Sequence, residues 1–327
     1  MADGAASDRI EAIRNVPTLD ALYEATAGIS TEPGWLRRDQ PAEYGRAQSA
    51  YMPGHWRYDE CKAVLDAAGR LIDVSLAERR NLVLRNPIKG NARVMTTRTL
   101  VGAYQMILPG EKAPSHRHTA HALRVIIDAR GAYSTVDGEK TPMETGDVVL
   151  TPGWCWHEHG HDGDEPAYWL DGLDVPLVVG LEGQFYEEHP DRFEKNVTAV
   201  TTSPYRFTRA EIARRLDRAT ADNEGYHGPR IILEAPTMPT MQLSMERLSS
   251  GMKTRPQRST ANHIFCCVEG AGESVIGGER FQWKRGDAFC APTWLAYEHR
   301  ASTDTLLFEL SDEPLMRFAR YWRQDGE

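Results

Sequence analysis

The chain has 327 residues, 41% hydrophobic and 26% charged, an ordinary globular composition with enough apolar material for one large or two smaller cores. Its net charge of −9 disfavours nucleic acid or an anionic membrane surface as a partner. We find no apolar run of membrane-spanning length, no secretion signal and no CxxC spacing among the five cysteines, so we expect a cytoplasmic protein with free thiols.

The first part of the chain, residues 1–90, is expected to be a helical region. Apolar residues recur at helical spacing from Asp8 to Thr26, where Pro17 interrupts the pattern, and more strongly from Tyr58 to Leu84. Arg80 lies in the second stretch beside other charged residues, so we expect it on a helix.

From about Ala92 the pattern changes to short β-rich runs that are separated by turns. Asp137-Gly138 stands between two of these runs and is a typical signal for a tight hairpin. The expected strands in this part are Leu100–Leu108, Ala122–Ile127, Ala132–Val136, Asp147–Thr151 and Ala167–Leu173.

These patterns predict the division of the rest of the chain. The N-terminal region is followed by a first β-domain over residues 91–190 and by a polar linker over 191–228, which holds a helix at Arg209–Ala219. A second β-domain covers residues 229–313, and a C-terminal helix covers 314–327.

An internal repeat relates the two β-domains. At an offset of 140, the sequence repeats Gly146-Asp147, Pro152, Trp154, His157, Glu158 and His159 as Gly286-Asp287, Pro292, Trp294, Tyr297, Glu298 and His299. At an offset of 141, it matches Gly110, His116, His118 and Gly131 with Gly251, Gln257, Ser259 and Gly272. One single-residue deletion would reconcile the offsets, so we expect two copies of one β-domain.

Three histidines of the first copy are expected to bind a metal ion. His116 and His118 lie two residues apart on one strand and therefore face the same side, and His157 follows a second glycine-bounded strand. Three imidazoles without cysteine suit a borderline divalent metal such as iron, manganese, nickel, copper or zinc. In the second copy Gln257, Ser259 and Tyr297 replace them, so we expect one metal site.

The spacing G-x5-H-x-H, followed by G-x5-P-x4-H, resembles the cupin superfamily, whose fold is a jelly-roll barrel. Most cupins also carry a glutamate ligand seven residues before a glycine, and this count from Gly131 reaches Arg124 instead. The departures resemble the gentisate 1,2-dioxygenase family and its salicylate and 1-hydroxy-2-naphthoate relatives. The similar stretches are Glu78–Pro87, Gln105–Glu111, His116–Arg124, Asp137–Glu139, Thr151–Gly160 and Trp169–Leu177.

This resemblance implies a mainly β bicupin, with two double-stranded β-helix barrels and an N-terminal helical region. It implies Fe(II) as the metal and a homotetramer as the assembly. It assigns the iron to His116, His118 and His157, substrate binding to Arg80, Gln105, Arg124, His159 and Asp171, and catalytic roles to His159, Arg124 and Asp171.

The expected reaction inserts O2 between the carboxyl-bearing and hydroxyl-bearing ring carbons of gentisate and gives maleylpyruvate. The same chemistry on salicylate, a 5-substituted salicylate or 1-hydroxy-2-naphthoate is an alternative. A second alternative is a non-oxidative metal-dependent cupin isomerase or lyase, and a third is a bicupin that binds a small acid without catalysis or serves storage.

Each site residue also has an ordinary structural interpretation. Arg124 could pair with a surface acid, and Arg80 could belong to the solvated face of a helix. His159 and Asp171 could form a buried hydrogen-bonded pair. His299, which lacks a metal-binding set beside it, is expected to serve core packing.

Overall fold

The computed structural model describes residues 2–35, 45–73, 79–90 and 95–326 and divides the chain into two compact units, residues 1–48 and residues 49–327. The first unit holds helices α1 (Ala2–Arg14) and α2 (Leu19–Gly28). Thr18 caps α2, because its hydroxyl accepts a hydrogen bond from the Ala21 amide at 3.2 Å. The expected helical segment with a break at Pro17 is confirmed.

The segment between this unit and the first barrel is only partly helical. Helix α4 ends at Leu71 (Tyr58–Leu71), while β1 (Gly54–Trp56) and β2 (Arg80–Val83) are strands. The prediction of a helix that continues to Leu84 is therefore wrong, and Arg80 lies on a strand. Strand β2 pairs with the neighbouring β3. This backbone pairing makes residues 80–83 extended although their apolar spacing is helical.

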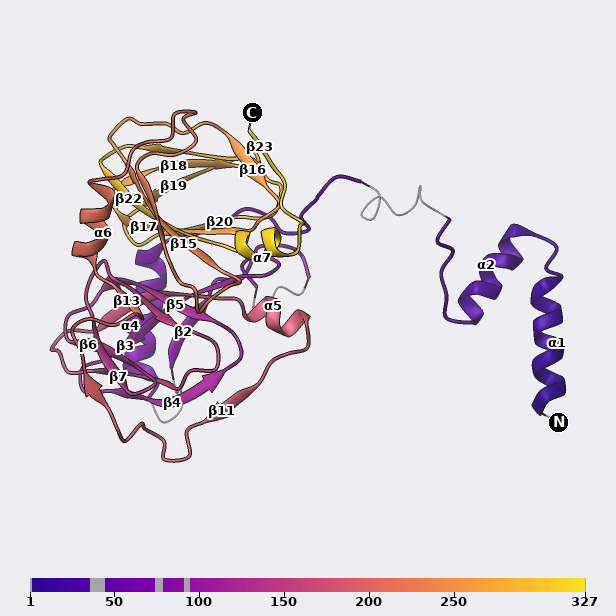
Figure 1. Ribbon diagram of the computed structural model, residues 1–327, viewed down its shortest axis with the longest axis horizontal. Helices are drawn as coiled ribbons and strands as arrows, with labels where there is room; N and C mark the ends of the chain where they lie inside the picture. Colours follow the sequence, from indigo (N-terminus) through magenta and orange to yellow (C-terminus); the bar gives the residue numbers. More distant parts are fainter. Residues whose placement is uncertain (1, 36–44, 74–78, 91–94, 327) are drawn as a thin grey trace. The chain divides into compact units, whose positions relative to one another are not determined.

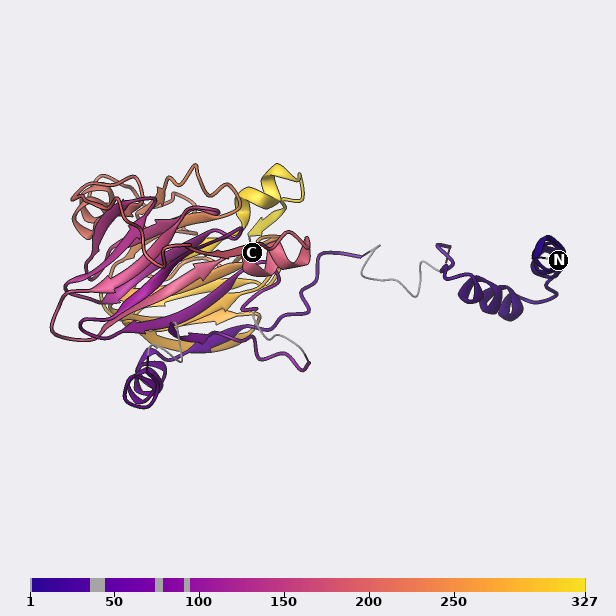
Figure 2. The ribbon, with the colours of Figure 1, turned by 90° about the horizontal axis from the view of Figure 1, so that it is seen from below.

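Residues 80–207 supply the strands of the first barrel (Figures 1 and 2). Its two six-stranded sheets have the orders β13-β8-β5-β10-β3-β2 and β11-β4-β9-β6-β7-β12. The further strands are β3 (Val101–Ile107), β4 (Lys112–His118), β5 (Ala122–Asp128), β6 (Ala132–Val136), β7 (Glu139–Met143), β8 (Val148–Thr151), β9 (His157–His161), β10 (Ala167–Leu173), β11 (Tyr186–Glu188), β12 (Thr198–Ala199) and β13 (Arg206–Phe207). Strands β2, β12 and β13 thus come from outside the expected range 91–190.

The second barrel combines the sheets β1-β20-β17-β22-β15-β14 and β19-β18-β21-β16-β23. Its strands are β14 (Arg230–Leu233), β15 (Gln242–Leu248), β16 (Gln257–Ser259), β17 (His263–Glu269), β18 (Ala271–Ile276), β19 (Glu279–Lys284), β20 (Ala288–Ala291), β21 (Tyr297–Ala301), β22 (Thr305–Ser311) and β23 (Gln324–Gly326). Three short helices, α5 (Val175–Gly180), α6 (Arg209–Leu216) and α7 (Glu313–Phe318), follow β10, β13 and β22.

The C-terminal region is only partly the helix that was expected over residues 314–327. Helix α7 ends at Phe318, and β23 pairs antiparallel with β16, with Arg258 opposite Asp325. An edge strand has unpaired backbone N–H and C=O groups, and those of β16 are paired here by the end of the chain.

The repeat is visible strand by strand, with one correction. Asp137 and Gly138 form the expected hairpin, with φ values of 45° and 82°. The positive-φ glycine that precedes β18 is Gly270 and corresponds to Gly131, whereas Gly272 lies within β18. A single deletion therefore does not reconcile the two copies.

The two barrels share one hydrophobic core. The cluster includes Leu123 and Val125 of β5 together with Phe308 and Leu310 of β22. The Tyr104 hydroxyl of the first barrel also donates to the Gly286 carbonyl of the second at 2.7 Å. The mainly β prediction is confirmed, and none of the described helices has the length and apolar character that a membrane crossing requires.

Candidate active site

Three histidine side chains converge inside the first barrel. His116 and His118 lie on β4 and His157 lies on β9, directly opposite His116. One ligand nitrogen from each side chain lies within 4.8 Å of the other two. The expected metal-binding set is therefore brought together by two neighbouring strands.

Burial favours the neutral form of the three imidazoles, which is the form that binds a metal ion. Burial lowers the pKa of His116 to about 2, with a further contribution from the charge of Arg79, and burial lowers the pKa of His118 to about 4. Burial also holds the pKa of His157 well below its ordinary value. Neutral imidazole is the metal-binding form, so this donor set fits a divalent transition metal.

Backbone carbonyls orient two of the rings. Nδ1 of His118 lies 2.8 Å from the Ala120 carbonyl, and Nδ1 of His157 lies 3.1 Å from the Cys155 carbonyl. An Nδ1–H that donates to a carbonyl leaves Nε2 with its lone pair free for a metal. The tautomer of both rings is thus set by the turns around them.

Arg124 and Asp171 form a buried ion pair on adjacent strands beside the triad. Nε of Arg124 lies 3.4 Å from Oδ1 of Asp171, and Nη1 donates to the Thr151 hydroxyl at 2.6 Å. Burial lowers the pKa of Arg124 to about 10 and raises that of Asp171 to about 6 against the opposing effect of Arg124. The positive charge of Arg124 also lowers the pKa values of His118 and His157, so the pair acts on the triad electrostatically.

Gln105 and His159 lie on the interior face of the same barrel. Gln105 pairs with Trp169 on β10, next to the pair of Ala103 with Asp171. The ring of His159, two residues beyond His157, lies 6.0 Å from the ring of His157 and 5.8 Å from that of Trp169. Both residues therefore share the barrel interior with Trp169, and the ring of His159 is the one that lies near the triad.

Arg80 does not lie where we expected it. It pairs with Met106 in the β2–β3 register, so it faces away from the strand positions of Gln105. Its guanidinium donates to the Ile72 carbonyl at 2.7 Å and to Glu111 at 2.6 Å. The arginine that lies beside the triad is Arg79.

Two residues near the triad were missed by the sequence reasoning. Nη2 of Arg79 lies 2.6 Å from Nδ1 of His116 and donates to the Pro114 carbonyl at 2.8 Å. The ring of Tyr186, on β11, stacks on His116 with centroids 5.1 Å apart. Strand parity at residues 79–83 would have separated Arg79 from Arg80, whereas no local signal pointed to Tyr186.

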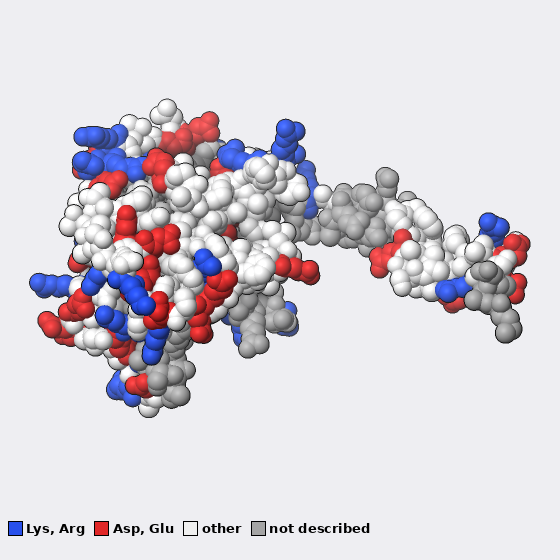
Figure 3. Space-filling model, turned by 60° about the horizontal axis from the view of Figure 1, so that its bottom comes forward, with Lys and Arg blue, Asp and Glu red and all other residues white. Residues whose placement is uncertain are grey.

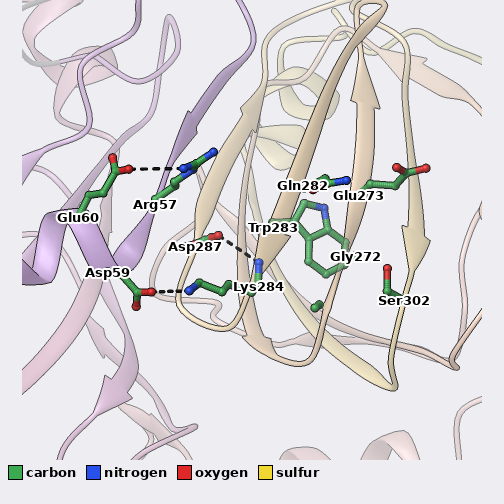
Figure 4. Close-up of a pocket in the computed structure, with 11 residues that line it drawn as sticks. Arg57, Asp59, Glu60, Gly272, Glu273, Gln282, Trp283, Lys284, Asp287 and Ser302 are labelled. Carbon is green, nitrogen blue, oxygen red and sulfur yellow. Dashed lines mark hydrogen bonds and ion pairs between the residues drawn. The ribbon is translucent and has the colours of Figure 1, made fainter.

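A pocket on the outside of the second barrel is unrelated to this site. It has a volume of about 500 Å³, and its walls include Arg57, Trp283, Lys284 and Asp287 (Figure 4). Lys284 pairs with Asp59 there, and Arg57 pairs with Glu60. Both basic side chains of this pocket are thus paired with acidic ones.

Comparison with known proteins agrees with the geometry. The Cupin domain family matches residues 103–175. The chain is 35% identical to gentisate 1,2 dioxygenase 1 of Aquipseudomonas alcaligenes, over 85% of this chain and 88% of that one, and 32% identical to 5-aminosalicylate 1,2-dioxygenase of Comamonas sp, over 94% and 90%.

A solved structure is similar along almost the whole chain. Salicylate 1,2-dioxygenase from Pseudoaminobacter salicylatoxidans, as an adduct with gentisate, superposes with a TM-score of 0.87 at 28% identity and covers 96% of this chain and 95% of that one. The chain therefore belongs to the gentisate 1,2-dioxygenase family of bicupins, ring-cleaving dioxygenases that include salicylate and 1-hydroxy-2-naphthoate dioxygenases.

Proposed function

We propose that this chain cleaves gentisate between the carboxyl-bearing and hydroxyl-bearing ring carbons and gives maleylpyruvate. The observation that carries the proposal is the set of three neutral imidazoles beside a buried arginine, Arg124. Both atoms of O2 enter the product, so the reaction needs no external reductant. Salicylate, a 5-substituted salicylate or 1-hydroxy-2-naphthoate is the alternative substrate, because relatives of similar identity are named for different ring acids.

Fe(II) is the metal that we assign to His116, His118 and His157. Three protein ligands leave positions free for the substrate and O2, and a bound ferrous ion would supply the redox chemistry that O2 requires. No carboxylate ligand is needed in this arrangement, since the substrate itself brings negative oxygen atoms.

Arg124 and Arg79 are assigned to binding the carboxylate of the substrate. A guanidinium offers paired N–H donors that match a carboxylate, and Arg124 is held for this by Asp171 and Thr151. Arg79 lies at the same triad, so we assign it the second contact in place of Arg80. Gln105 and His159 face the ring hydroxyls as hydrogen-bonding partners.

Oxygen uptake tests the proposed function. Protein loaded with Fe(II) without air is offered gentisate, salicylate, 5-substituted salicylates and 1-hydroxy-2-naphthoate, and the ultraviolet spectra of the products are recorded. We expect one O2 per substrate and the fastest reaction with gentisate. Faster turnover of another acid would replace gentisate as the substrate, and no uptake by protein that contains iron would overturn the proposal.

Replacement of one histidine tests the metal assignment. We expect His118→Ala to lose bound iron and activity, because two imidazoles hold a divalent ion far more weakly than three. Ser259→Ala, the matched change at the corresponding position of the second barrel, should keep one iron per chain. An active His118→Ala variant with a full complement of iron, measured by elemental analysis, would contradict the assignment.

A further inference from the structure

We propose that Ser134 and Thr141 form a buried hydroxyl relay that orients His159 and fixes its tautomer. The inference rests on the proposed function, since it gives His159 a defined role toward the substrate. Ser134 and Thr141 are positioning residues here, because they act through His159 and not on the substrate.

The three side chains form one row across three strands. Ser134 on β6 lies directly opposite His159 on β9 and directly opposite Thr141 on β7. Residues opposite each other in antiparallel strands share a face and lie side by side. This face is the barrel interior, because His157, two residues before His159, points into the triad. Each of the three side chains is almost completely buried.

This row carries polar atoms that are not satisfied within the described part of the chain. Ser134 Oγ, Thr141 Oγ1 and both ring nitrogens of His159 are buried there without a hydrogen-bond partner. Buried polar groups are rarely left in this state, since each one loses its interaction with water. The Ser134 and Thr141 hydroxyls change direction with χ1, which has three staggered positions, so the relay requires rotamers that turn both hydroxyls along the row.

The second barrel contains the corresponding row, and there the side chains are hydrogen-bonded to one another. His299, which corresponds to His159, lies with Nδ1 2.7 Å from Oγ of Ser274, the counterpart of Ser134. The indole of Trp283 donates to that hydroxyl oxygen at 2.8 Å. Because Ser274 accepts from Trp283, its own proton is available to donate to His299 Nδ1.

The first barrel replaces the indole donor with a hydroxyl. Met143 stands at the register position of Trp283, and Thr141 stands at the position of Phe281. In the proposed relay Thr141 takes the place of the indole as donor to Ser134, and Ser134 donates to Nδ1 of His159 in the direction that Ser274 has toward His299. The proton of the imidazole then resides on Nε2, and His159 presents an N–H donor to a substrate oxygen.

Nuclear magnetic resonance of ¹⁵N-histidine-labelled, Zn(II)-loaded protein tests the tautomer directly. The His159 signals are identified by their absence in His159→Gln. We expect the Nε2–H form in the wild type, a mixture of forms in Ser134→Ala and in Thr141→Val, and recovery in Ser134→Thr. The wild-type tautomer in both Ser134→Ala and Thr141→Val would overturn the relay.

Steady-state kinetics with Fe(II) and gentisate provide the second arm. We expect kcat/KM to fall about tenfold in Ser134→Ala and to recover in Ser134→Thr. Ser274→Ala, the matched change in the second barrel, should change the His299 signals and leave kcat/KM unaltered. Equal losses of kcat/KM in Ser134→Ala and Ser274→Ala would overturn the relay. A wild type that turns over no substrate would contradict the proposed function, and the magnetic-resonance experiment would still test the relay.

Discussion

At the scale of single residues, burial sets the chemistry of the candidate site. Arg124 is fully buried, and the carboxylate of Asp171 lies beside it. A buried charge is tolerated only when a partner of opposite sign and hydrogen bonds replace its water. The ion pair with Asp171 therefore holds the guanidinium of Arg124 in one orientation beside the triad before any substrate enters.

The exchange of Arg79 for glutamine tests which arginine binds the carboxylate. We expect Arg79→Gln to raise KM for gentisate about 10–100-fold, because a charge-assisted hydrogen bond contributes about 1.5–3 kcal/mol. Arg80→Gln is the control: it removes the ion pair with Glu111, so it should lower the melting temperature and leave KM unchanged. A rise in KM with Arg80→Gln alone would return the carboxylate contact to Arg80.

The pH dependence of unfolding reports on His299. Burial lowers the pKa of this histidine to about 4, while an unfolded histidine has a pKa of about 6.5. Between these values the unfolded chain binds a proton that the folded chain does not, so stability falls as pH falls, by about 1.4 kcal/mol per pH unit for this one group. His299→Gln should show a correspondingly shallower loss in urea titrations, and an unchanged slope would contradict the shift.

At the scale of elements, the two hairpins at equivalent positions of the repeat form a matched pair. The first is Asp137-Gly138 between β6 and β7, and the second is Gly277-Gly278 between β18 and β19. Both second glycines have a left-handed backbone, with φ values of 82° and 87°. They differ only in surroundings, since a Cβ on Gly138 would lie 2.9 Å from the Asn196 carbonyl oxygen and one on Gly278 would meet nothing within 4 Å.

Alanine at each hairpin separates backbone strain from crowding. We expect Gly278→Ala to lose about 1–2 kcal/mol of unfolding free energy through the left-handed φ alone. Gly138→Ala should lose more, because the backbone at Asn196, which precedes β12, must also move. Denaturant titrations of the two variants give the difference, and equal losses would show that the contact with Asn196 costs nothing.

At the scale of the whole molecule, residues 49–327 form one compact unit in which both barrels share a core. Acidic and basic side chains are interspersed on the face shown in Figure 3. Homotetramer formation stays a prediction, which light scattering of the purified protein would test.

Removal of the first unit tests the independence of the second. We expect a chain of residues 49–327 to fold, to bind one iron and to unfold in a single transition, since the shared core couples the two barrels. Calorimetry and metal analysis of the shortened chain provide the measurement. Two separate transitions, or failure to fold, would show that the core does not couple the barrels or that residues 1–48 are needed.

Spacing along the chain was enough to predict several features of this protein. Strands β3, β5, β6, β8 and β10 follow from β-rich runs between turn residues. The Asp137-Gly138 hairpin, the repeat and the convergence of His116, His118 and His157 follow from motif spacing. β-rich runs and tight turns are local signals, because they depend on the residues of the run itself; strands such as β3 and β6, which are buried on both faces, are recognised by composition and not by alternation.

Features that depend on a partner far away in the sequence became visible in the folded chain alone. Residues 80–83 became a strand at the free edge of β3, and this pairing turned Arg80 outward and left Arg79 beside the triad. Strand β23 formed on β16, and the row from Thr141 to His159 exists only because β6 lies between β7 and β9. Edge strands and cross-strand neighbours are set by backbone hydrogen bonds between remote segments, and no local periodicity encodes those bonds.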